Sequence, residues 1–117
     1  MPWATVDFLD IECANVLAST TRHGTIDLPY AEASLGIVAA LPLARWPSAA
    51  VLQSALRLSC EHDVSVYDAC YVALADALGI PVITADDRLV RRLEGTRHAV
   101  VHLRDVGAGR GEHPSGT

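Results

Sequence analysis

One stretch near the middle of the chain constrains the fold more than any other, because a long apolar helix leads almost directly into a strand. Ser65 and Asp68 have the spacing of a capping box, and the apolar residues 69–78 that follow predict a buried helix, which a glycine ends. Residues 81–84 predict a short buried strand, since they are too few for a helix and lie between helix breakers. A helix followed directly by a buried strand favours an α/β fold.

The rest of the chain predicts further helices and short strands around this segment. We expect helices at residues 6–22, 29–40, 48–61 and 88–93, and strands at residues 41–46 and 98–103. Together with the central segment they predict one domain at residues 1–106. Residues 107–117 are rich in Gly, Pro, Ser and charge, which predicts a disordered tail. No apolar run approaches the ~20 residues that a membrane span needs, so we expect no contact with a membrane.

The basic residues of the chain are all arginine, and the absence of lysine excludes several classes of enzyme. P-loop NTPases, Schiff-base enzymes and Ser-Lys hydrolases all need a lysine. Three cysteines in apolar, helix-like stretches favour reduced thiols over a disulfide framework, and the lack of a signal-peptide pattern makes the cytoplasm the expected location. The net charge of -5 opposes general affinity for nucleic acid, but clustered acids could hold a divalent cation that offsets phosphate repulsion.

Two aspartates flank the central helix and strand in a way that suggests chemistry. A helix that precedes a strand in a parallel βαβ unit runs antiparallel to it, so the helix begins at the edge where the strands end. Asp68 lies in the first turn of that helix, and Asp86 lies just past the strand. We therefore expect both carboxylates to face one cleft at the edge where α/β folds bind ligands. Such a pair suits Mg²⁺ or Mn²⁺, which can activate water for phosphoryl chemistry.

Each candidate residue also has a purely structural interpretation. Asp68 could serve only as part of a capping box, Asp86 as a helix N-cap or turn residue, and Glu12 as a solvated acid beside an apolar stripe. The arginines at positions 88, 91 and 92 could meet RNA phosphates or simply form a solvated helix face. The histidines show no metal-ligand spacing, so we assign none of them to a site.

A family resemblance adds to this pattern. Residues 63–89, DVSVYDACYVALADALGIPVITADDRL, resemble the C-terminal motif of VapC-type PIN domains, in which YDA opens an alanine-rich helix and a short strand ends in TAD. Residues 10–17, DIECANVL, are similar to the helix that bears the glutamate of that family. The resemblance spans residues 3–103. It implies a PIN-like α/β/α sandwich with a short parallel sheet.

The resemblance also implies a site, a cofactor and partners. Glu12, Asp68 and Asp86 match three of the four acidic positions that coordinate metal in the family, with Asp87 a less favoured alternative to Asp86. Thr84 would position the TAD loop, and Tyr67 would pack structurally. The implied protein is a toxin-like endoribonuclease that uses Mg²⁺ or Mn²⁺ to cut RNA. Its expected partners are a small VapB-type antitoxin and a second copy of the chain.

The sequence departs from the family pattern at its beginning. Family members begin with a strand that ends in an aspartate and a helix that follows, and we find no match to them before Trp3. We therefore expect a sheet without its central strand, and feeble RNA cleavage by this chain. The backbone along Val82 and Ile83 should be unpaired or covered by another chain. Two alternatives stay open: a non-catalytic PIN-like module that binds an antitoxin or another protein, and an unrelated α/β domain whose acids are all caps.

Overall fold

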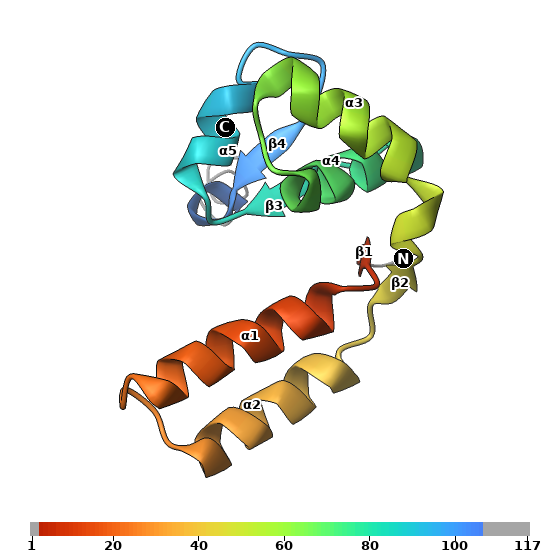
Figure 1. The fold of residues 1–117 in the computed structure, drawn as a ribbon. Coiled ribbons are helices and arrows are strands. Elements are labelled where there is room, and N and C mark those ends of the chain that lie inside the picture. The colour runs from red at the N-terminus through yellow and green to blue at the C-terminus, as the bar shows by residue number, and fades with distance from the viewer. Residues whose placement is uncertain (1–2, 107–117) are drawn as a thin grey trace, which may run out of the picture. The chain divides into compact units, whose positions relative to one another are not determined.

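The computed structural model describes residues 3–106 (Figure 1). The chain forms two compact units, residues 1–48 and 49–117. Each unit contains helices and one two-stranded parallel sheet. The α/β class with short parallel strands, predicted from the sequence, is confirmed. The single domain of residues 1–106 stays a prediction, and the predicted tail lies outside the described residues. Within residues 3–106, no helix is both long and apolar enough to cross a membrane.

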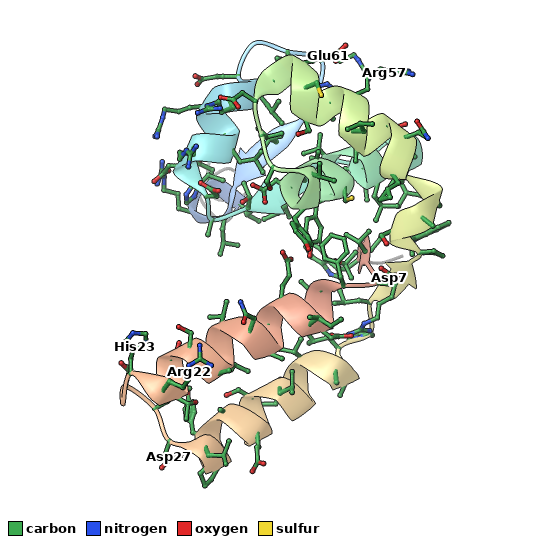
Figure 2. The ribbon with its side chains drawn as sticks, viewed as in Figure 1. Asp7, Arg22, His23, Asp27, Arg57 and Glu61 are labelled. Carbon is green, nitrogen blue, oxygen red and sulfur yellow. The ribbon has the colours of Figure 1, made fainter. Side chains whose placement is uncertain are left out.

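The first unit is a helical hairpin joined to a small sheet. Its elements are β1 (Ala4–Val6), α1 (Leu9–Arg22), α2 (Leu28–Ala40) and β2 (Ala44–Trp46). Asp27 caps α2 as its carboxylate accepts a hydrogen bond from the Tyr30 amide at 2.9 Å. Figure 2 shows Asp27 at the turn of the hairpin, together with Arg22 and His23 from the end of α1. β1 and β2 run parallel, with Ala4 opposite Ala44.

One arginine ties the elements of the first unit together. Arg45, the middle residue of β2, contacts both carboxylate oxygens of Asp10 on α1, through Nε at 2.9 Å and NH2 at 3.0 Å. The same guanidinium donates to the Val38 carbonyl near the end of α2. Hydrogen bonding to Asp10 raises the pKa of Arg45 above its ordinary value. Two-pronged contact of this kind fixes geometry as well as charge, so Arg45 sets where both helices meet the sheet.

The second unit contains most of the buried apolar side chains. After the single turn η1 (Ser48–Ala50), it consists of α3 (Leu52–His62), α4 (Val66–Leu78), β3 (Val82–Thr84), α5 (Asp87–Leu93) and β4 (Val100–His102). The helix α4 is the most deeply buried element. Its buried residues are Ala69, Cys70, Val72, Ala73, Leu74 and Ala75. Small side chains let neighbouring elements approach α4 closely, and Ala55, Leu58, Leu89 and Leu93 add to the buried set.

The outer edge of β3 carries backbone groups without a ladder partner. Within the described residues, β3 pairs only with β4, in parallel and with Val82 opposite Val100. The Val82 amide donates to the Ala99 carbonyl at 2.9 Å. Because alternate residues of a strand point their backbone groups to opposite sides, Ile83 directs its N–H and C=O away from β4. This is the unpaired edge that the sequence predicts.

The predicted elements match the structure except at the start of the chain. All the predicted helices are present, with α1 beginning at Leu9 rather than residue 6, and the 48–61 helix divided into η1 and α3. The sequence does not predict the strand β1, since the helix expected there begins at residue 6. Three residues are too few to show a period, and β1 owes its form to pairing with β2 some 40 residues later. Both Thr5 and Val6 are buried, as suits a strand.

Removing the cap of α4 tests the local basis of this helix. The Ser65 hydroxyl accepts a hydrogen bond from the Asp68 amide at 3.0 Å, so Ser65→Ala leaves that amide without its partner. We expect a loss of about 1 kcal/mol in the free energy of unfolding, measured by urea denaturation. Ser54→Ala on the exposed side of α3 is the matched control and should be neutral or slightly stabilising, because alanine favours helix. Equal effects of the two changes would contradict the capping role.

Candidate carboxylate site

Asp68 occupies the first turn of α4, where the Ser65 cap starts the helix. Its backbone amide donates to the Ser65 hydroxyl in that cap. The residue is half-buried, and within the described part of the chain no hydrogen bond or ion pair to its carboxylate is seen. The positive end of the helix dipole favours a carboxylate in this position. Asp68 is thus both a favourable helix-start residue and an available oxygen ligand.

Asp86 begins the next helix, two residues after β3 ends. Its Oδ1 accepts a hydrogen bond from the Arg88 amide at 2.9 Å, which makes Asp86 the N-cap of α5. Its own amide donates to the Thr84 hydroxyl at 3.0 Å, and this contact gives Thr84 the loop-positioning role expected for it. Asp86 therefore does cap a helix, as its structural interpretation predicts. It uses one oxygen and leaves the other available to a ligand.

Asp87 is held differently from Asp86. Its Oδ1 lies 3.2 Å from Nε2 of His102, at the end of β4, and 3.2 Å from NH1 of Arg104. These donors offset the negative charge of Asp87 within the protein. A compensated carboxylate is a poorer candidate for a metal ligand than one with an unused oxygen. The contacts therefore favour Asp86 over Asp87, in agreement with the family pattern.

The strands bring the ends of several elements to one edge of the second unit. Since β3 and β4 are parallel, Asp86 and His102 lie at the same edge of the sheet. A connection of only three residues, 79–81, turns α4 into β3, so α4 runs back along the strand and its first turn, with Asp68, is directed to that edge. Gly79 allows this turn with a φ of 69°, in the left-handed region.

Glu12, the third predicted ligand, lies on α1 in the other unit and is half-buried there. Within residues 3–106, no three side chains of His, Cys, Asp or Glu form a group that could hold a metal ion. The second unit by itself supplies two candidate carboxylates, Asp68 and Asp86, and their oxygens are of the hard type that Mg²⁺ prefers.

The pKa of the Cys13 thiol depends in part on the charge of Glu12. The pKa of the Cys13 thiol is raised above its ordinary value, mainly by burial and further by the Asp10 and Glu12 carboxylates. A negative neighbour disfavours the thiolate, so Glu12→Gln should lower the pKa of Cys13. We expect the pH profile of Cys13 alkylation by iodoacetamide, followed by mass spectrometry, to shift to lower pH in this variant. Glu32→Gln on α2 is the control, and an equal shift there would show that Glu12 is not the cause.

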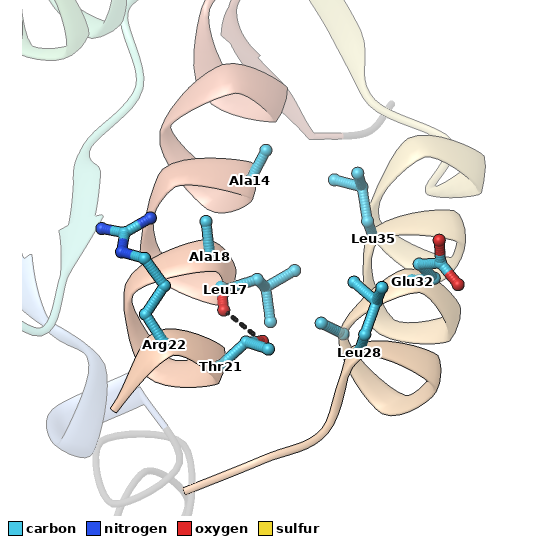
Figure 3. Close-up of a pocket in the computed structure, with 9 residues that line it drawn as sticks. Ala14, Leu17, Ala18, Thr21, Arg22, Leu28, Glu32 and Leu35 are labelled. Atoms are coloured by element: carbon cyan, nitrogen blue, oxygen red, sulfur yellow. Dashed lines mark hydrogen bonds between the residues drawn. The ribbon is translucent and has the colours of Figure 1, made fainter. Parts of the chain in front are cut away.

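The hairpin of the first unit carries a separate apolar groove, of about 290 Å³, between α1 and α2 (Figure 3). Leu17 from α1 faces Leu28 and Leu35 from α2 across it, while Arg22 and Glu32 stand at its rim. No residue of α1 is buried, and Ala31 is the one buried residue of α2.

A model of the PIN domain family matches residues 3–94 of the chain. The chain therefore belongs to the PIN domain family, as the YDA and TAD motifs predicted. The curated proteins to which it is similar include several named ribonuclease VapC.

Three relatives illustrate the match. The chain is 47% identical to ribonuclease VapC12 of Mycobacterium tuberculosis over 51 residues, which cover 44% of this chain and 38% of that protein. It is 37% identical to ribonuclease VapC1 of the same organism over 82 residues, 69% of this chain and 60% of the relative. It is 46% identical to ribonuclease VapC3 of Pyrobaculum aerophilum over 44 residues, 38% and 34% of the two proteins. The matches cover less than two thirds of each of these relatives, so no activity of theirs is established for this chain.

Proposed function

We propose that this chain is a toxin-like endoribonuclease of a type II toxin–antitoxin system, with a divalent cation held by a carboxylate cluster. The observation that carries the proposal is the placement of Asp68 and Asp86 at the starts of two helices on one sheet edge. Membership of the PIN family and likeness to proteins named ribonuclease support RNA as the substrate. The reaction would be hydrolysis of an RNA phosphodiester bond, with no protein nucleophile.

Glu12, Asp68 and Asp86 are the proposed ligands of Mg²⁺ or Mn²⁺. All three offer carboxylate oxygens, and the Asp86 carboxylate is already held by the Arg88 amide, so less of its side-chain entropy is lost on binding. When bound, the cation would supply positive charge for the phosphate and a water of lowered pKa. The Thr84 hydroxyl holds the loop that carries Asp86, so this carboxylate keeps its place without a ligand.

A small VapB-type antitoxin and a second copy of the chain are the proposed protein partners. The family resemblance suggests both. The apolar groove between α1 and α2 supports a protein partner, and so do the exposed side chains of Ile11, Val16, Tyr30 and Ile37 on these helices. A partner that covered this surface would remove its exposed apolar side chains from water.

Cation-dependent cleavage of a labelled, structured RNA hairpin tests the proposed activity. We would compare this chain with a version extended upstream by a strand that ends in an aspartate, each with MgCl₂ or MnCl₂ and with EDTA. The extended version should cleave only with the cation, and the present chain only feebly, because a misplacement of about 1 Å can lower a rate about 100-fold. If a folded, extended version did not cleave the RNA, a non-catalytic antitoxin-binding module would be favoured instead. Cleavage that persists in EDTA would refute the metal site.

A further inference from the structure

A cluster of three residues lies beside the proposed metal-binding edge and is not part of the ligand set. It consists of Asp87 at the start of α5, His102 at the end of β4, and Arg104 two residues later. Asp87 Oδ1 is 3.2 Å from His102 Nε2 and 3.2 Å from Arg104 NH1. Because Asp87 follows Asp86 directly, the cluster and the candidate ligand share one helix start.

Hydrogen bonds fix the orientation of this cluster. The Arg104 amide donates to Nδ1 of His102 at 3.1 Å, so Nδ1 is the acceptor of the ring and Nε2 carries the proton toward Asp87. The His102 side chain is largely buried, whereas 66% of the Arg104 side chain is exposed. Asp87 and His102 thus hold the side chain of Arg104, whose guanidinium is exposed at the sheet edge.

Only one end of the Arg104 guanidinium is used within the described part of the chain. NH1 donates to the Asp87 carboxylate at 3.2 Å. It also lies 3.4 Å from Nε2 of His102, but that nitrogen carries a proton and does not accept from it. The remaining N–H groups form a fork that matches the oxygens of a phosphate. Part of the side-chain entropy of Arg104 is already lost before a ligand arrives, which favours binding.

Three other arginines of the second unit, Arg88, Arg92 and Arg97, are less suited to this role. Arg92 already pairs with Asp63. Its NH1 donates to the backbone carbonyl of Asp63 and, at 2.8 Å, to the Asp63 carboxylate. Arg97 lies 3.7 Å from Asp76, away from the helix starts at which the candidate carboxylates lie. Arg88 is exposed and close in sequence to Asp86, but no side-chain contact orients it among the described residues.

We propose that Arg104, oriented by Asp87 and His102, binds a backbone phosphate of the RNA next to the carboxylate site. This inference rests on the proposed function for its choice of ligand. A chain with a net charge of -5 needs a local cation to hold RNA against its own acids, and Arg104 supplies one at the required edge. Arg104 would be a binding and positioning residue rather than a catalytic one.

Binding of a fluorescein-labelled RNA hairpin in EDTA, followed by anisotropy over a range of salt concentrations, tests this role. Arg104→Gln should raise the Kd by about 5- to 10-fold and lower the slope of log K against log salt by about 0.7 to 1. Arg104→Lys should keep the slope but recover only part of the affinity, since lysine lacks the fork. Arg97→Gln is the control, because it removes the same charge from the same unit.

The outcomes separate this inference from the proposed function. A larger effect of Arg104→Gln than of Arg97→Gln supports the phosphate contact, even if no cleavage is found. Equal effects of these two substitutions would overturn it, even if cleavage still depends on Asp68 and Asp86. Circular dichroism of each variant verifies that it has folded, and a folded Arg104→Gln protein with unchanged Kd likewise overturns the inference.

Discussion

Replacing Asp68 or Asp86 by asparagine in the upstream-extended version should lower its cation-dependent RNA cleavage by about 100-fold or more. Asparagine keeps the size of each side chain but removes the charge and half of the hard oxygen donors. Asp86→Asn also keeps a side-chain oxygen that can cap α5, so the fold should survive. The measurement is the single-turnover rate with MnCl₂, combined with Mn²⁺ titration by electron paramagnetic resonance.

Glu94→Gln is the matched control for these substitutions, since this exposed residue at the opposite end of α5 carries the same charge. Its cleavage rate should stay within about twofold, because surface charges far from a site act weakly at moderate salt. Full activity in Asp68→Asn or Asp86→Asn would remove that residue from the ligand set. Rates lowered equally in Glu94→Gln would point to a general charge effect instead.

The sequence predicts those features of the fold that depend on neighbouring residues. Ser65 caps α4 as its spacing from Asp68 indicates, and Gly79 takes the left-handed conformation that ends this helix. These signals are strong because each depends on one turn of chain. The same local logic placed Asp68 and Asp86 at helix starts, so the predicted positions of these two candidates hold.

Long-range contacts were not predicted from the sequence. The pairing of Arg45 with Asp10 joins residues 35 apart, and nothing in the pattern around either residue indicates it. His102 was set aside because it lacks metal-ligand spacing, yet its position at the end of a predicted strand could have marked it as an edge residue. Partners distant in sequence show no period, so local patterns cannot reveal them.

Leu93→Ala should be the most destabilising of the substitutions considered for the second unit. Leu93 ends α5 and is 2% exposed, among the largest fully buried side chains of the described residues. Truncation removes its buried methyl groups and leaves a cavity, which typically costs about 2–5 kcal/mol. Small domains are commonly stable by only about 5–15 kcal/mol, so this loss is a large share of the total.

Urea denaturation followed by far-UV circular dichroism measures this loss as a fall in the midpoint with little change of slope. Leu56→Ala is the control, because the same atoms are removed from a helix where the side chain is 54% exposed. That change should cost no more than about 1 kcal/mol, since less apolar surface leaves contact with protein and no cavity forms. If the two variants unfolded at the same urea concentration, Leu93 would not be part of a packed core. The burial around α5 positions both Asp86 and Asp87, so the same result would also weaken the case that this edge is preorganised to bind RNA.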